Sequence, residues 1–275
     1  MRPAAYLVIC IAFFLSGACG VADKSTQDSQ LENQFNCGTQ FIKETSTIRH
    51  CGLIDYKLLQ YLKNEKDTRT LLLTSEGGQI LDAISLSKYL DEYKIRLIIE
   101  GYCLSACATF LVAGTDLVTI QSNSILGFHH STTSLAMRGT QNGLLNEGQL
   151  KRIHEEFVQP EISFFEENNI STAWLFEPDL RTKPSCVKRN LRFSDEVPII
   201  DYRARHRFWV PSIPTLKKLN PTLILEGNAQ THDAVQTIAN THLLLKGQAL
   251  LYGNPENLEF NPDDINLLSQ LPFCS

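Results

Sequence analysis

The sequence predicts an α/β fold, with a mostly parallel sheet and helices on both of its faces. Short apolar runs with strand character alternate along the chain with longer segments of helical periodicity. Strands that alternate with crossover helices are typical of parallel sheets. The chain has 275 residues, of which 43% are hydrophobic and 20% are charged, which is enough apolar material for one substantial core and an appendage.

The first 22 residues resemble an export signal. Arg2 precedes an apolar run over residues 4–15, and small residues follow at positions 16–18. Two cleavage sites compete. Cleavage after Ala22 would leave a soluble protein, and cleavage before Cys19 would leave a lipid on that cysteine and tether the protein to a membrane. Either product predicts a location in the periplasm or cell envelope.

Composition divides the remaining chain into three parts. Residues 23–34 are polar and predict a solvated linker. Residues 35–220 carry the alternating pattern and predict the main domain, which begins with a hairpin between Cys37 and Cys51. Residues 221–275 predict a C-terminal extension, in which residues 234–246 have helical character and residues 248–253 have strand character.

The main domain contains eight well-marked segments, four helices and four strands. The predicted helices cover residues 56–64, 80–93, 105–113 and 149–167, the last interrupted near Pro160, and the predicted strands cover residues 69–74, 95–99, 117–120 and 125–128. A strand, a turn and a helix are expected again over residues 208–220.

Eight cysteines are many for a cytosolic enzyme and favour disulfides in an exported protein. We expect Cys37 to pair with Cys51 and Cys186 with Cys274, the cysteines that remain outside the candidate site. Two others, Cys103 and Cys107, flank Ser105. They could form a bridge if the helix begins after Cys103, or join two histidines in a metal site.

Three short motifs could carry chemistry. Gly77 and Gly78 lie at a strand-to-helix turn, where backbone N–H groups can approach a ligand closely. Ser105 lies in the first turn of a predicted helix of small residues, where the helix dipole favours negative charge. His129 and His130 end a buried strand, and adjacent strand residues point to opposite faces.

Together these motifs, "TSEGG", "CLSACATFLVAG" and "NSILGFH", resemble in order and spacing the active-site segments of the Clp protease family, within the Clp/crotonase superfamily. The resemblance covers roughly residues 51–154. It implies a crotonase-like ββα superhelix with Ser105 as nucleophile and His129 as general base. It also implies an oxyanion hole formed by the N–H groups of Gly77 and Ala106, with Gly78 keeping the turn open.

The same resemblance implies an acidic third residue that orients the histidine. Asp201 precedes Phe208 by about the distance found in the family, and Asp179 and Asp195 are rivals. The chain departs from the family pattern at Glu76, where the turn usually has proline, and in its longer segment between residues 169 and 208.

The predicted function is therefore an exported serine hydrolase that cleaves peptides or proteins without a metal or other cofactor. A homo-oligomer is expected by analogy with the superfamily. With a net charge of −5 and no basic stripe, the sequence gives no indication of nucleic-acid binding. Three alternatives stay open: a binding or regulatory module of the same fold without catalysis, an acyl-CoA enzyme of crotonase type, and a metal-binding envelope protein.

Overall fold

The computed structural model describes residues 38–141, 146–182, 184–190, 199–204, 206–241 and 250–253. The chain divides into two compact units, residues 1–36 and residues 37–275, and all described residues belong to the second. The predicted export signal, the linker and Cys37 therefore lie outside the described residues.

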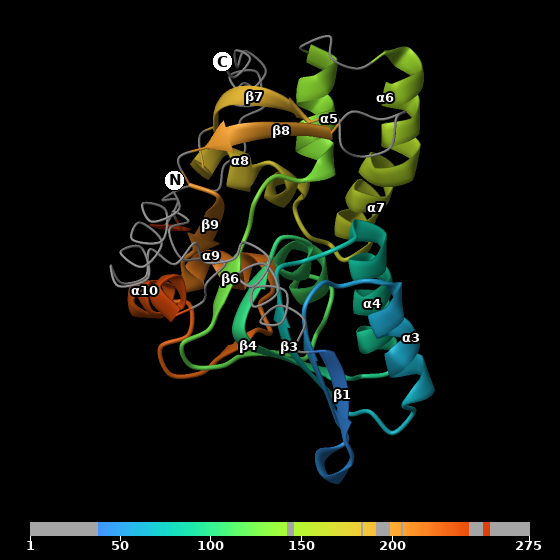
Figure 1. Ribbon diagram of the computed structural model, residues 1–275, viewed down its shortest axis with the longest axis vertical. Helices are drawn as coiled ribbons and strands as arrows, with labels where there is room; N and C mark the ends of the chain where they lie inside the picture. Colours follow the sequence, from blue (N-terminus) through green and yellow to red (C-terminus); the bar gives the residue numbers. More distant parts are fainter. Residues whose placement is uncertain are drawn as a thin grey trace, which may run out of the picture. The chain divides into compact units, whose positions relative to one another are not determined.

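A seven-stranded, mostly parallel sheet forms the centre of this unit, as the sequence predicts (Figure 1). The strands lie in the order β1-β2-β3-β4-β5-β10, with β6 also paired to β4. Their bounds are Gly38–Ile42 for β1, Thr47–Cys51 for β2, Thr70–Ser75 for β3, Arg96–Leu104 for β4, Val118–Ile120 for β5, Ile125–Gly127 for β6 and Ile224–Leu225 for β10.

Only β1 runs antiparallel to its neighbour in the sheet. It pairs with β2 around a short 3-10 turn, Lys43–Thr45, in the segment where the sequence predicts a hairpin. The next strand, β3, has alternating burial because each second side chain enters the core. Its buried Leu71 and Leu73 have no exposed surface.

Two helices connect the first parallel strands. The first, α3 (Tyr56–Asn64), begins at Asp55, whose carboxylate accepts hydrogen bonds from the N–H groups of Lys57 and Leu58 and so caps the helix. The second, α4 (Ile80–Glu92), packs against α3 and against a short π-helix, η2 (Cys107–Val112), which follows β4. All six residues of η2 are buried.

A group of helices follows β6. They are α5 (Thr132–Gln141), α6 (Glu147–Ile153), a π-helical turn η3 (His154–Val158), α7 (Gln159–Glu167), a 3-10 turn η4 (Thr172–Leu175) and α8 (Glu177–Thr182). The predicted helix over residues 149–167 corresponds to α6, η3 and α7. The sequence analysis did not predict α5, whose residues include Thr, Ser and Gly, which are poor helix formers.

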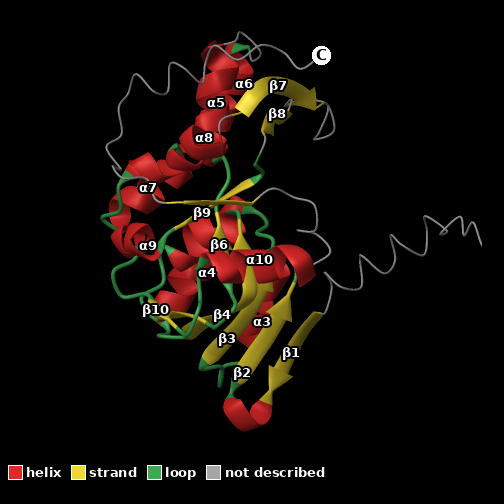
Figure 2. Ribbon diagram, turned by 90° about the vertical axis from the view of Figure 1, so that its left-hand side faces the viewer, coloured by secondary structure: helices red, strands yellow, loops and turns green. Residues whose placement is uncertain are grey.

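The last described elements extend this unit. They are the antiparallel pair β7 (Pro184–Asn190) and β8 (Ile199–Ala204), then β9 (Phe208–Pro211), α9 (Ile213–Leu219), α10 (His232–Thr241) and β11 (Leu250–Gly253), the last parallel to β9. Figure 2 shows α10 beside the sheet, where its Ala234, Val235 and Ile238 share a core cluster with Ile125 of β6.

The segment predicted as a C-terminal extension contributes to this core. Its β10 adds an edge strand to the central sheet beside β5. The fully buried Gln230 accepts a hydrogen bond from the N–H of Leu126 and donates to the carbonyls of Leu126 and Pro211. Because a buried amide needs these partners, they tie the loop that carries Gln230 to β6 and β9.

Among the described helices, none combines the length and the apolar character needed to cross a bilayer.

Substitution of Gly78 tests whether the turn after β3 packs too closely to admit a side chain. A Cβ on Gly78 would lie 2.0 Å from the carbonyl oxygen of Ile54, and its φ of +152° disfavours any side chain. We expect Gly78→Ala to lower the free energy of unfolding by about 3 kcal/mol, measured by urea denaturation. Gly253→Ala is the matched control, since a Cβ there meets nothing within 4 Å. Equal stability of the two variants would contradict this packing.

Candidate functional site

Two turns meet where the parallel strands β3 and β4 end. After β3 the chain passes through Gly77, and after β4 it passes through Ser105 and Ala106. A Cβ on Gly77 would lie 2.7 Å from the Cβ of Ser105 and 3.1 Å from the backbone nitrogen of Ala106. With a φ of +109°, Gly77 also has a backbone conformation that other residues rarely adopt. Glycine is therefore required for the two turns to touch.

Ser105 has an unusual backbone for a residue with a side chain. Its φ is +56°, in the left-handed region, where a residue other than glycine carries a steric cost. The sequence analysis placed Ser105 in the first turn of the helix, but the π-helix η2 begins two residues later, at Cys107. The reversal at Ser105 is fixed by hydrogen bonds from its N–H to the carbonyl of Gly127 and from the N–H of Thr109 to its carbonyl, both at 2.9 Å.

A disulfide closes this turn. Cys103, near the end of β4, is bonded to Cys107, the first residue of η2, and both side chains are completely buried. The bond spans the two arms of the turn that presents Ser105. It also removes both cysteines as nucleophiles or metal ligands, which leaves Ser105 as the nucleophilic side chain of this segment.

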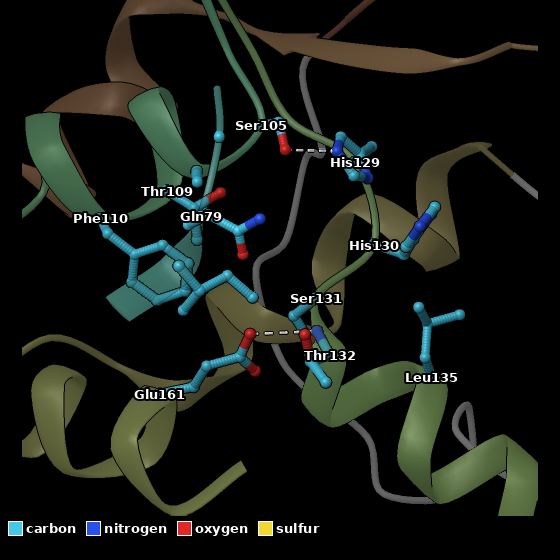
Figure 3. A pocket seen from close by; sticks show the side chains of 13 residues that line it. Gln79, Ser105, Thr109, Phe110, His129, His130, Ser131, Thr132, Leu135 and Glu161 are labelled. Carbon is cyan, nitrogen blue, oxygen red and sulfur yellow. Dashed lines mark hydrogen bonds between the residues drawn. The ribbon is translucent and has the colours of Figure 1, made fainter. Parts of the chain in front are cut away.

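His129 lies opposite Ser105. Its strand, β6, ends at Gly127, and Phe128 then forms an antiparallel bridge to Trp209 of β9, with both of their backbone hydrogen bonds at 2.8 Å. This pair of backbone hydrogen bonds fixes the position of His129, the next residue. Nε2 of His129 lies 2.5 Å from Oγ of Ser105, a hydrogen bond drawn in Figure 3. The structure thus brings together the two residues that the sequence analysis chose as nucleophile and base.

The surroundings of His129 favour the neutral imidazole. Desolvation lowers the pKa of His129 well below its usual value, the neighbouring His130 and Arg207 lower it further, and the charge of Asp179 acts in the opposite direction. A neutral histidine at neutral pH can accept a proton, which a general base requires.

Among the described residues, Asp179 is a carboxylate whose charge raises the pKa of His129. It belongs to α8, and its side chain has no exposed surface. Nδ1 of His129 is buried and has no hydrogen-bond partner among the described residues. Asp201 lies in β8, where its backbone pairs with Lys188 and its side chain is outside the described part, and Asp195 lies outside it altogether. The role of Asp201 stays a prediction.

His130 does not point away from His129, as strand alternation led us to expect. The two rings lie 4.3 Å apart between centroids in an edge-to-face arrangement, and both line the same cavity. The reason is that β6 ends before them, so the alternation of strand side chains does not extend to these positions.

The expected oxyanion donor must also be changed. The N–H of Gly77 donates to Oγ of Ser75 at 3.0 Å and is therefore not available to a ligand. Gly78, by contrast, is exposed and lines the cavity beside Ser105, as does Ala106. Gly78 and Ala106 are therefore backbone positions of these two turns that border the cavity beside Ser105.

A cavity of about 380 Å³ adjoins the Ser105–His129 pair. Figure 3 shows that the pair lies at one end and Glu161 of α7 at the other. The cavity is lined by Gly78, Gln79, Ile80, Ser105, Ala106, Thr109, Phe110, His129, His130, Ser131, Thr132, Leu135 and Glu161. A side chain of a substrate held at Ser105 could enter it.

The remaining cysteines give a partial picture. Cys51 and Cys186 are each disulfide-bonded. Their predicted partners, Cys37 and Cys274, and the predicted lipid site Cys19 lie outside the described residues, so these pairings and the anchor stay predictions. Within the described segments, no group of three or more His, Cys, Asp or Glu side chains is arranged to hold a metal ion.

Comparisons with known proteins found no matching family model and no matching curated protein. Solved structures with a similar fold include a ClpP1 mutant from Listeria monocytogenes, at 13% identity and a TM-score of 0.38, covering 70% of this chain and 95% of that one. Another is methylmalonyl CoA decarboxylase, at 12% identity and a TM-score of 0.29, covering 42% of this chain and 59% of that one. These TM-scores are low, and the functional argument therefore rests on the geometry of this chain.

Proposed function

We propose that this chain is a serine hydrolase with a Clp-protease-like fold, which cleaves peptide or similar amide bonds by acyl transfer. The observation that carries the proposal is the 2.5 Å hydrogen bond between Oγ of Ser105 and Nε2 of His129 at the end of a cavity. A serine at a sharp strand-to-helix turn, hydrogen-bonded to a histidine, is the arrangement that nucleophilic catalysis needs.

Acylation follows from this geometry. Oγ of Ser105 attacks the carbonyl carbon of the substrate while its proton passes to Nε2 of His129. The C–Oγ bond forms, and the carbonyl electron pair moves onto oxygen. The oxyanion lies against the N–H groups of Gly78 and Ala106, which stabilise it more than the planar ground state. The C–N bond then breaks, and Nε2 gives its proton to the leaving amine.

Deacylation repeats these steps with water. His129 removes a proton from a water molecule, which attacks the acyl carbon and forms a C–O bond. The C–Oγ bond breaks, and Ser105 recovers its proton from Nε2. Over the two steps, the proton of Ser105 passes through Nε2 to the leaving amine, and a proton of the water passes through Nε2 to Ser105.

We assign the orienting carboxylate to Asp179, in place of the predicted Asp201. For Nε2 to accept a proton, Nδ1 of His129 must carry one, and a nearby carboxylate favours that tautomer. Asp179 is the buried carboxylate whose charge raises the pKa of His129. Catalytic hydrogen bonds often form only in the complex with substrate, and we expect the contact between Asp179 and Nδ1 to form there.

We also propose that the protein works outside the cytoplasm, in the periplasm or cell envelope. The disulfide between Cys103 and Cys107 supports this, because such bonds persist in oxidising compartments. The export signal, a lipid on Cys19, peptide or protein substrates and a homo-oligomer remain parts of the proposal that depend on the sequence alone.

One observation favours the alternative, a binding module of the same fold without catalysis. Nδ1 of His129 has no hydrogen-bond partner among the described residues, and a base without an orienting partner is a weak one. Such a module would bind peptides in the cavity and would not react with covalent inhibitors of serine hydrolases.

Substitution of the pair gives the first test. Ser105→Ala and His129→Ala should each reduce amide hydrolysis by about 1,000-fold or more, and the double variant should lose no more than either single one, because the two residues act as a unit. Peptidase assays on the purified mature protein measure this. Additive losses, or activity that survives in Ser105→Ala, would exclude the proposed pair.

The pH dependence follows from the lowered pKa of His129. His129 can act as a base only while it is neutral. When the pH is lowered, kcat/KM should therefore stay high below pH 6.5 and should fall only when the pH drops below the lowered pKa of His129. His130→Ala removes a neighbour that lowers the pKa of His129. In this variant, the loss of kcat/KM at acidic pH should therefore occur at a higher pH. If kcat/KM of the unchanged protein already falls at or above pH 6.5, the assignment of His129 as the general base is contradicted.

The orienting carboxylate can be identified by comparing two matched variants. Asp179→Asn should lower kcat by about 100-fold or more, since an amide favours the wrong histidine tautomer, and should leave KM nearly unchanged. Asp201→Asn should have little effect on kcat. The reverse result would restore Asp201, the residue that the sequence resemblance indicated.

A further inference from the structure

Glu161 is a buried acid at the end of the cavity opposite the catalytic pair. It comes from α7 and has no exposed surface, yet it borders the same cavity as Ser105 (Figure 3). Acidic residues are almost never fully buried unless they are paired. Its position at the base of the cavity therefore needs a physical explanation.

The contacts of Glu161 are all with the start of α5. Oε1 accepts a hydrogen bond from the N–H of Thr132 at 3.0 Å, and Oε2 accepts two from Thr133, from its N–H at 2.8 Å and from its Oγ1 at 2.5 Å. These donors satisfy much of the carboxylate, and they fix it in one orientation. Each carboxylate oxygen can accept more than one hydrogen bond, so a further donor can share Oε1 with the N–H of Thr132.

These donors supply partial charges only. No lysine, arginine or histidine in the described part of the chain forms an ion pair with Glu161. Burial raises the pKa of Glu161 in spite of the hydrogen bonds from Thr133 and Thr132. The raised value expresses the cost of holding a carboxylate away from water without a counter-ion, which a bound cation would offset.

The walls between Ser105 and Glu161 suit a long side chain with an apolar stem. Ile80, Phe110 and Leu135 line the cavity together with the amide of Gln79. Lysine and arginine combine a hydrocarbon stem with a charged end group, so the stem can contact the apolar walls while the end group meets the carboxylate.

We infer that this cavity selects substrates with a lysine or arginine side chain on the residue whose carbonyl Ser105 attacks, and that Glu161 is the residue that recognises the cation. This inference rests on the proposed hydrolase function. It adds a substrate class, basic peptides cleaved after the basic residue, to the reaction derived above.

A purely structural role for Glu161 predicts a different outcome. If the carboxylate only caps α5, its removal would lower stability and leave the choice between basic and neutral substrates unchanged. The preference for one substrate over another is therefore the measurement that separates recognition from capping.

The experiment compares two single-residue thioesters of matched length, N-acyl-lysine and N-acyl-norleucine thiobenzyl esters, on the purified full chain. Norleucine has the lysine stem without the amine. We expect kcat/KM to favour lysine by about 100-fold, the effect of one buried charge pair. A preference for norleucine, or equal rates, would overturn the inference and leave the hydrolase proposal standing.

Two variants complete the test. Glu161→Gln keeps the shape of the side chain and loses its charge, and the lysine preference should fall to about 1. Glu167→Gln removes a charge from the exposed side of the same helix, outside the cavity, so the preference should persist. An unchanged preference in Glu161→Gln would assign Glu161 to capping alone.

The hydrolase proposal has its own control in Ser105→Ala. If the unchanged chain hydrolyses neither ester faster than Ser105→Ala, both proposals fail together. If Glu161→Gln does not fold, a competition experiment on the unchanged chain supplies the second measurement. Butylguanidinium, which carries a cation, should slow the labelling of Ser105 by a fluorophosphonate, and the neutral pentanol should not. Equal protection by the two compounds would overturn the inference.

Discussion

The contact between two backbone turns underlies the candidate site. At the ends of β3 and β4, Gly77 packs against Ser105 and Ala106 so closely that an added Cβ would lie 2.7 Å from the Cβ of Ser105. This contact holds the backbone of Ser105 in a left-handed conformation, and the disulfide between Cys103 and Cys107 closes the same turn. Because parallel strands end at the same edge of a sheet, the fold itself brings together the residues that we propose as nucleophile and oxyanion donors.

Local patterns predicted the elements that carry this arrangement. The alternating apolar residues of β3 and the helical spacing of α4 placed both elements within about one residue of their observed bounds, because burial of one face determines each pattern. The pairing of Ser105 with His129 was predicted from the order of three motifs. The hydrogen bond between them could be seen only in the structure, because it depends on the bridge between Phe128 and Trp209, residues far apart in the sequence.

Features decided by tertiary contacts escaped prediction. The hydrogen bond from the N–H of Gly77 to Oγ of Ser75, on which our proposal of Gly78 as oxyanion donor rests, depends on a side-chain orientation that the sequence motif does not specify. Asp179 was only a rival to Asp201, because nothing in the sequence shows that α8 is buried beside His129. Glu161 lies in a stretch with ordinary helical polarity, and its importance follows from its burial against Thr132 and Thr133.

The central claim is that Ser105 is an activated nucleophile, and a covalent adduct tests it most directly. The purified protein is treated with a fluorophosphonate, and intact-mass and peptide mass spectrometry then locate the product. Oγ of Ser105 should displace fluoride and form one phosphonate ester per chain, in the peptide that contains Ser105, because His129 at 2.5 Å removes the proton from Oγ. An unmodified protein, or an adduct on another residue, would contradict the claim and favour the binding module.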